Sequence, residues 1–163
     1  MLSNVWFTSD LHLGHELAAK NRGFASVEEH DAAIIYNINK VVNKNDKLFI
    51  LGDLAMNKQK LEQLSEIRCR NKELLIGNHD LYQTQHYLRW FTKVHGFRKY
   101  ENYWLSHCPV HPQEMYRTKG NIHGHIHKGA ATHELPLPYY NVNVDFHNCN
   151  PVNFTWIKQA FGE

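Results

Sequence analysis

Short apolar runs alternate with polar segments along the first half of the chain. The runs Asn4–Thr8, Lys47–Leu51 and Glu73–Ile76 have the length and apolar character of buried strands. Between the first two, Val27–Val42 carries apolar residues at helical spacing and follows a Ser-x-x-Glu capping box that begins at Ser26. This alternation predicts strands joined by helices that pack on one sheet.

Two more segments, Lys58–Arg68 and Leu81–Lys93, repeat apolar residues at helical intervals, so the N-terminal half is predicted to be β-α-β-α-β. The C-terminal half is richer in strands, which are predicted at Gly96–Tyr100, Tyr103–Ser106, Asn121–His123, Tyr139–Val144 and Val152–Ile157. The polar segment His111–Gly120 predicts a loop. Without repeats or a linker, we expect one domain of α/β class over residues 1–163.

The composition fits a globular domain, because 42% of the 163 residues are apolar and can form a core. No apolar stretch approaches the ~20 residues that span a bilayer, and the chain does not start with a secretion signal. Three cysteines without a C-x-x-C pair argue against a disulfide framework. We therefore expect a cytoplasmic protein with no membrane partner. A net charge of +2 is too small to indicate nucleic acid.

Residues that can bind metal ions follow most of the predicted strands. They fall in five segments, Asp10-Leu11-His12, Gly52-Asp53, Gly77-Asn78-His79-Asp80, Ser106-His107-Cys108-Pro109 and Gly124-His125-Ile126-His127. Sites in open α/β sheets form beyond the carboxyl ends of strands, so these segments are expected to meet. Together they supply two carboxylates, one amide oxygen and four imidazoles, a set that suits two divalent ions better than one.

The order of these motifs resembles that of the calcineurin-like metallophosphoesterases. Within that superfamily it is most similar to a branch of short bacterial and phage-type phosphoesterases, whose Ser-Asp-x-His-x-Gly-His opening is matched by Ser9–His15. The Asn-Arg-Pro-Phe element of the branch is matched by Asn21–Phe24 except at Gly23, where proline is expected. The resemblance implies a metallophosphoesterase-like β-sandwich flanked by helices, in a single domain without a cap.

The resemblance also implies how the ligands would be divided between two divalent ions. Asp53 would bridge the ions, of which the first would also take Asp10, His12 and His127 and the second Asn78, His107 and His125. Carboxylate, amide and imidazole ligands without a thiolate suit Mn, Fe, Zn, Co or Ni better than Mg or Ca. By resemblance, Mn²⁺ is the expected ion.

Four further residues are expected to act on the substrate or beside it. By resemblance, His79 would protonate the leaving alkoxide, and Asp80 would orient the ring of His79. His15 would either touch a substrate phosphate or be only structural. Arg22 would either grip a phosphate bidentately or form an ion pair at the surface.

The predicted function is hydrolysis of phosphodiester bonds by a metal-activated hydroxide, on a small nucleotide-like substrate. A diester is favoured over a monoester because Arg22 is the only cation expected beside the metals. One alternative is a metal-dependent nuclease, suggested by a set of basic and aromatic residues that includes Lys93, Arg98, Lys99, Arg117, Lys119, Trp90, Tyr100 and Tyr116. The other alternative is a non-catalytic binding module on the same fold.

Other side chains near the motifs are left outside the predicted site. His123 extends the alternation to His-x-His-x-His but is not expected to be a ligand, because the ligand positions are already filled. Cys108 is expected to be a bystander, since zinc thiolate sites usually contain paired cysteines. The roles of Asp145, His111 and His147 stay open, as do the physiological substrate and the oligomeric state.

Overall fold

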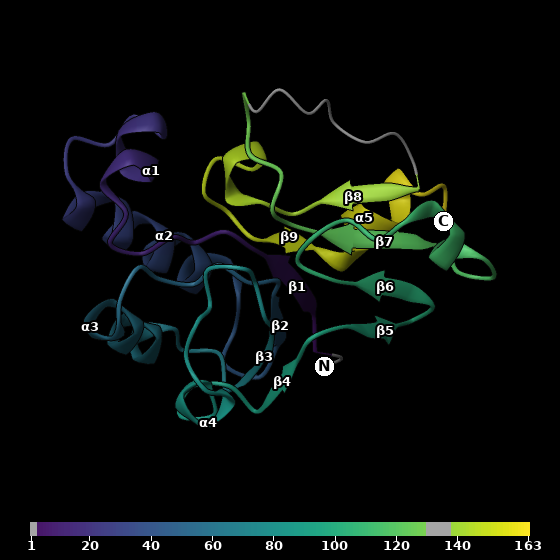
Figure 1. Cartoon of the computed structure of the whole chain (residues 1–163), viewed down its shortest axis with the longest axis horizontal. Coiled ribbons are helices and arrows are strands. Elements are labelled where there is room, and N and C mark those ends of the chain that lie inside the picture. Colours follow the sequence, from purple (N-terminus) through teal and green to yellow (C-terminus); the bar gives the residue numbers. More distant parts are fainter. Residues whose placement is uncertain (1–2, 130–137) are drawn as a thin grey trace.

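The computed structural model describes residues 3–129 and 138–163. Two β-sheets lie side by side, and helices gather on the outer side of the larger sheet (Figure 1). Both sheets contain parallel and antiparallel pairs. The predicted α/β class is therefore confirmed at the level of mixed sheets and helices.

The larger sheet has five strands in the order β4-β3-β2-β1-β9. They are β1 (Val5–Thr8), β2 (Lys47–Ile50), β3 (Asn71–Leu75), β4 (Lys93–His95) and β9 (Val152–Asn153). Strands β1 to β4 pair in parallel, and β9 pairs antiparallel with β1. Because β1, β2 and β3 run in the same direction, the loops that follow them leave the sheet at the same edge.

The smaller sheet has four strands in the order β5-β6-β7-β8. They are β5 (Arg98–Tyr100), β6 (Tyr103–Leu105), β7 (Gly120–His123) and β8 (Tyr139–Asn141). The predicted hairpin is present as the antiparallel pair β5–β6, whereas β6, β7 and β8 are parallel. A parallel bridge between Ser9 and Asn143 links the loop after β1 to the chain after β8. The carboxyl ends of the two sheets therefore meet.

The described residues form five α-helices and three 3-10 helices. They are α1 (Glu16–Asn21), α2 (Val27–Val41), α3 (Lys58–Leu61), η1 (Glu62–Glu66), α4 (Thr84–Tyr87), η2 (Pro112–Met115), η3 (Val144–Phe146) and α5 (Phe154–Ala160). Helix α5 follows the last strand, and the others connect strands. The expected capping box starts α2, because the Ser26 hydroxyl accepts the backbone N–H of Glu29. No helix in the described ranges is long and apolar enough to cross a membrane.

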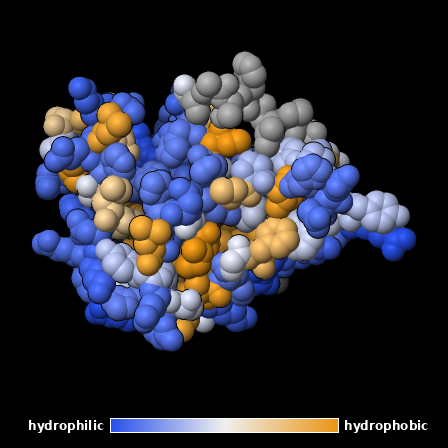
Figure 2. All heavy atoms as spheres, viewed as in Figure 1, coloured by the Kyte–Doolittle hydropathy of each residue, from blue (hydrophilic) through white to orange (hydrophobic). Residues whose placement is uncertain are grey.

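Side chains of the larger sheet are buried on both of its faces. Trp6, Leu48 and Ile50 belong to a core shared with α2, whereas Phe7 and Phe49 belong to the core between the two sheets. This alternation follows from the two-residue period of a strand. Because both faces are buried, the sequences of these strands are continuously apolar. Figure 2 shows polar side chains over most of one face of the molecule, with apolar groups gathered near its centre.

The predicted strand Val152–Ile157 is wrong beyond its first two residues. Only Val152–Asn153 pairs with β1, and the Asn153 side chain then accepts the backbone N–H of Thr155 at the start of α5. Phe154 and Ile157 lie three residues apart and are both buried in the core between the sheets. Burial of apolar residues at helical spacing decides the conformation of this segment.

The second and third predicted helices are shorter than expected. Lys58–Arg68 forms α3 and η1, and Leu81–Lys93 contains only the single turn of α4 before β4 begins. The polar strand β4 was not predicted, because it adds to the edge of the larger sheet rather than to its buried centre. Neither difference changes the loops that carry the motifs.

Candidate metal centre

The five motifs meet where the carboxyl ends of the two sheets come together. The loops after β1, β2 and β3 of the larger sheet and after β6 and β7 of the smaller sheet carry them. Backbone hydrogen bonds tie the loops to each other: Asp10 N donates to Gly52 O, and Gly124 N donates to His107 O. The side chains named by the motifs are therefore neighbours in space.

The backbone in these loops is unusual. Four of the predicted ligands have positive φ angles, Asp10 (57°), His12 (48°), Asp53 (56°) and His125 (68°). Residues other than glycine rarely adopt this region, and those that do are often functional. Glycines supply the space: a methyl group on Gly77 would collide with Asp53, and one on Gly124 would collide with Ser9 and Asp10. The chain is shaped here to hold side chains in place.

Three side chains form the first predicted group of ligands. His12 Nε2 and His127 Nε2 are 3.2 Å apart, and Asp10 Oδ1 lies 3.9 Å from the first and 3.7 Å from the second. Ligands of one ion with bonds of about 2.0–2.2 Å lie roughly 3–3.5 Å apart. The spacing in this group is therefore close to that of ligands around one ion.

The second predicted group is equally close. Asn78 Oδ1 lies 2.9 Å from His107 Nε2 and 3.0 Å from His125 Nδ1, and these two nitrogens are 3.2 Å apart. Asp53 stands between the two groups, with Oδ2 3.4 Å from His107 Nε2 and 3.6 Å from His12 Nε2. Its Oδ1 accepts the backbone N–H of His79 at 3.0 Å. One oxygen of Asp53 thus faces both groups.

Hydrogen bonds behind the ring of His107 fix which of its nitrogens carries a proton. His107 Nδ1 lies 2.7 Å from Leu51 O, an oxygen that can only accept. Neutral His107 therefore turns the lone pair of Nε2 toward Asp53 and Asn78. This tautomer is the one that a metal ligand needs, so the donor set fits a divalent ion.

The pKa values support the neutral form at His12 but not at His107. Burial alone would lower the pKa of His107, but the hydrogen bond to Asp53 and the nearby carboxylate of Asp10 raise it, so a metal ion at Nε2 would have to displace the proton there. Burial lowers the pKa of His12 to about 3, so this imidazole is neutral. Burial alone would raise the pKa of Asp53, but the hydrogen bond from His107 and the nearby imidazoles lower it to about 2. Burial raises the pKa of Asp10 to about 6. Neutral imidazoles and ionised carboxylates are the forms that bind metal ions.

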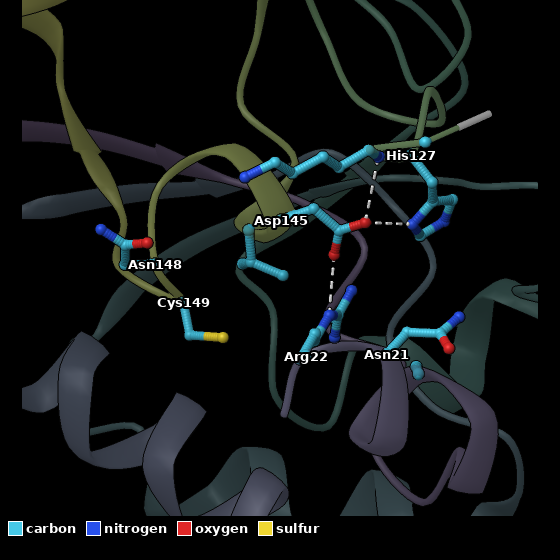
Figure 3. A pocket seen from close by; sticks show the side chains of 10 residues that line it. Asn21, Arg22, His127, Asp145, Asn148 and Cys149 are labelled. Carbon is cyan, nitrogen blue, oxygen red and sulfur yellow. Dashed lines mark hydrogen bonds and ion pairs between the residues drawn. The ribbon is translucent and has the colours of Figure 1, made fainter. Parts of the chain in front are cut away.

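Asp145 and Arg22 support the ring of His127 from behind (Figure 3). Asp145 Oδ2 lies 2.8 Å from His127 Nδ1, and Asp145 Oδ1 accepts Arg22 Nε–H at 2.7 Å. The hydrogen bond to Asp145 raises the pKa of His127. The sequence left the role of Asp145 open, and its position assigns it to orienting His127.

Arg22 lies behind the ligands in an ion pair, which is the second of the two roles that the sequence left open, although this pair is buried and not at the surface. Its guanidinium donates to Asp145, to the backbone oxygens of Asp10 and Leu11, and it contacts His30 Nε2 at 2.9 Å. Only 6% of its side chain is exposed. With its donors used inside the protein, Arg22 braces the first motif instead of gripping a substrate.

Asp80 also differs from its predicted role. Its carboxylate accepts three backbone N–H groups, from Gly77 at 2.8 Å and from Asp53 and Leu54 at 2.9 Å each. No hydrogen bond to the ring of His79 is present among the described residues. Asp80 therefore orients the loop of Asp53, and only through that loop the neighbouring His79.

His79 and His15 lie beside the cluster without belonging to either ligand group. Both rings pack edge-on near His12, with centroids 5.7 Å away for His79 and 5.6 Å away for His15. His15 Nδ1 accepts the backbone N–H of Ala18 and so caps α1. Burial lowers the pKa of His15, and the proton of the neutral ring is then on Nε2.

The remaining histidines are placed as follows. His123 is buried, with Nδ1 2.8 Å from Gly124 O, and His147 Nε2 lies 2.8 Å from Asn141 O. His111 starts η2 at the surface. His133 lies outside the described residues. Cys108 Sγ lies within 4.8 Å of ring nitrogens of His107 and His125, which is nearer than its predicted role as a bystander required.

The chain is similar in sequence to phage and archaeal proteins. It is 44% identical to the "Gene 66 protein" of Mycobacterium phage L5 over 84 residues, which are 48% of this chain and 41% of the phage protein. It is 30% identical to the "Uncharacterized protein MJ1445" of Methanocaldococcus jannaschii over 168 aligned residues, which are 96% of this chain and 90% of the archaeal protein. The match therefore spans about two fifths of the phage protein. No protein-family model matches the chain.

A solved structure from Aquifex aeolicus, titled as the protein of unknown function AQ665, superposes with a TM-score of 0.79 and covers 98% of this chain. At 24% identity this likeness concerns the fold alone. The similarity to the archaeal protein extends over nearly the whole of both chains. The chain therefore belongs to the family of the archaeal protein.

Proposed function

We propose that this chain, as a member of the archaeal protein's family, is a dinuclear-metal phosphoesterase of the calcineurin-like type that hydrolyses small phosphodiesters. One observation carries the proposal: Asp53 Oδ2 lies within 3.6 Å of a ring nitrogen in each of two separate ligand groups. A carboxylate oxygen shared in this way suits two neighbouring divalent ions. Bound ions would lower the pKa of a water and offset negative charge on phosphoryl oxygens.

The protein's own side chains would bind and orient a phosphate ester beside these ligands. His15 Nε2–H is available to donate to a phosphoryl oxygen, because Nδ1 is engaged at the start of α1. His79 is exposed at the edge of the cluster and can give a proton to the leaving alkoxide. The backbone N–H of His79 donates to Asp53, so the proton donor and the bridging carboxylate keep a fixed relation.

The preference for diesters rests on the charges around the cluster. Arg22 is occupied behind the ligands, which leaves the described residues without a fixed guanidinium beside the substrate. A diester carries one negative charge and needs fewer cationic partners than a dianionic monoester. Because Arg22 is engaged inside the protein, the expectation that the substrate is a diester becomes stronger.

The alternative of a nuclease receives little support. Arg98 is bound to Glu73, Lys119 pairs with Glu163 at 2.8 Å, and the ring of Tyr100 packs on Phe49. These three residues of the expected basic and aromatic set are engaged within the protein, whereas Lys99, Arg117 and Tyr116 are exposed, so only part of the set is available to a polynucleotide.

A test of the proposal uses the purified full chain and a matched pair of aryl phosphate substrates. Hydrolysis of bis(p-nitrophenyl) phosphate should stop after treatment with a chelator and return with added Mn²⁺, and the diester should have a higher kcat/KM than p-nitrophenyl phosphate. If metal-loaded protein hydrolyses neither ester, the enzyme hypothesis is wrong and the non-catalytic binding module becomes the favoured function. A clear monoester preference would contradict the substrate class, and efficient, salt-sensitive cleavage of polynucleotide would favour the nuclease.

A further inference from the structure

A pocket of about 460 Å³ lies next to the candidate metal centre, behind His127. The His127 ring lines this pocket, while Nε2 of the same ring belongs to the first ligand group. Figure 3 shows the hydrogen-bonded pair Arg22–Asp145 in the lining of the pocket, with Asp145 joined to the ring of His127. The volume falls in the range of about 300–1,000 Å³ typical of small-molecule sites. A substrate held at the ligands would therefore have room for a second group here.

Opposite ends of the pocket carry amide side chains. Asn21, at the end of α1, lies on one side, and Asn148, in the loop after η3, lies on the other (Figure 3). Neither amide makes a side-chain hydrogen bond with any residue in the ranges 3–129 and 138–163. Each can donate and accept, which is the pairing that the edge of a nucleobase offers.

Part of the wall between the two amides is apolar, and its charged side chains are one ion pair and Lys128. Ala18, Val144 and Cys149 contribute apolar surface, which suits the faces of a flat ring. Arg22 and Asp145 neutralise each other in an ion pair with an N–O distance of 2.7 Å. The apolar part of the wall and the two amides therefore suit a planar group with polar edges, and Lys128 can offset one negative charge on the same ligand.

We propose that this pocket binds the nucleobase of a nucleoside phosphodiester whose phosphate lies at the metal ligands. The proposal rests on the proposed phosphodiesterase activity and names the substrate class of the same site. Lys128 follows His127, one of the candidate ligands, and lines the same pocket.

Two substitutions alter the pocket without touching the ligands. Ala18→Leu fills the pocket and keeps a residue that favours helix in α1. Asn148→Gly removes one amide and retains the positive φ of 49° at that position. Their matched controls are Ala32→Leu, on the exposed face of α2, and Asn102→Gly, an exposed asparagine with a φ of 68° in the β5–β6 turn.

Binding is measured first, by titration calorimetry of chelator-treated full chain with adenosine and thymidine 5′-monophosphates. Ala18→Leu and Asn148→Gly should each weaken binding about tenfold, whereas the two controls should stay within about twofold of wild type. The two nucleotides tell whether the pocket takes a purine or a pyrimidine. Equal affinity of wild type and Ala18→Leu for both nucleotides would overturn the proposal.

Turnover separates this proposal from the proposed function. With Mn²⁺, the ratio of kcat/KM for a nucleoside 5′-aryl phosphodiester to that for a methyl aryl phosphodiester should fall about tenfold in Ala18→Leu. Hydrolysis of both diesters with an unchanged ratio would overturn the base pocket and leave the phosphodiesterase standing. No hydrolysis at all, with nucleotide binding still weakened by Ala18→Leu, would overturn the enzyme and support the pocket.

Discussion

Two buried carboxylates, Asp53 and Glu73, both have histidine neighbours, but the protein completes them in different ways. Glu73 lies between the sheets, where Lys47 Nζ and His95 Nε2 approach its oxygens to 2.8 and 2.9 Å and Arg98 approaches from β5. Its charge is balanced by cations that belong to the chain. This network joins three strands of the larger sheet to the edge of the smaller sheet.

Around Asp53 the neighbours are imidazole nitrogens, whereas ammonium and guanidinium groups surround Glu73. Ring nitrogens of His12 and His107 and the amide oxygen of Asn78 turn toward one another at distances near those of ligands around an ion. A buried carboxylate beside histidine can therefore have two roles in this protein. Where the chain supplies the cation, the group holds the fold together; where acceptors converge, we propose that the cation comes from solution.

The substitution Asp53→Asn should have the largest effect, because it tests the proposed bridge between the two ions. The substitution removes the charge of the one side chain that faces both ligand groups, so we expect both ions to be lost and phosphodiesterase activity to fall below detection. Elemental analysis of the purified variant measures the metal content. Retention of two ions per chain would contradict the assignment of Asp53 as the bridge.

His79→Ala separates the proton donor from the ligands. His79 lies outside both ligand groups, so the variant should retain two ions by elemental analysis while kcat falls by roughly 10²–10⁴, the usual size of a general-acid contribution. An aryl leaving group of low pKa should reduce this loss, because it needs less help from a proton donor. Loss of an ion from His79→Ala would show that the roles within residues 77–80 are wrongly assigned.

Glu73→Gln tests the other carboxylate. Removing its charge leaves Lys47 and Arg98 without their common partner, so the free energy of unfolding should fall by about 3 kcal/mol, the lower end for a broken buried pair. Urea denaturation of chelator-treated protein measures it, and metal content should stay at the wild-type value. A loss of ions without a loss of stability would contradict the structural role of Glu73 and its separation from the metal site around Asp53.

The effect of Glu73→Gln on the free energy of unfolding should depend on pH. Burial alone would raise the pKa of Glu73, but the hydrogen bonds from Lys47 and His95 and the nearby Arg98 hold it below its usual value of 4.5. A carboxyl with a lower pKa in the folded state stabilises the protein fully above its unfolded pKa, and this stabilisation is lost as the pH falls through the folded pKa. The stability difference between wild type and Glu73→Gln should therefore shrink below about pH 4.5.

Asp145→Asn should have the smallest effect. It removes the carboxylate that orients His127 but leaves every ligand in place, so metal affinity at the first group should weaken about 10–100-fold. Competition with a chelator measures affinity, and the second group serves as the internal control. Equal weakening of both ions would indicate that Asp145 acts on the whole fold and not on His127.

The sequence predicted the elements whose residues are specified locally. The capping box at Ser26 and the apolar spacing in Val27–Val42 gave α2 to within one residue of its observed end. The strand ends that carry Asp53 and Asn78 were also found, because apolar runs stop where the chain leaves the core. Helix α1 was missed, since its cap is the imidazole of His15, which is not a usual signal for the start of a helix.

What the sequence by itself determined was the set of candidate metal-binding side chains and their order, because each follows closely on a buried strand. Only the tertiary structure decided what supports them. The contacts of Arg22 and Asp80 are made across the fold, by Arg22 to Asp145 and by Asp80 to the backbone of Asp53. Neither partner is near in sequence, and the sequence alone does not distinguish a side chain that forms hydrogen bonds within the protein from one that faces a substrate.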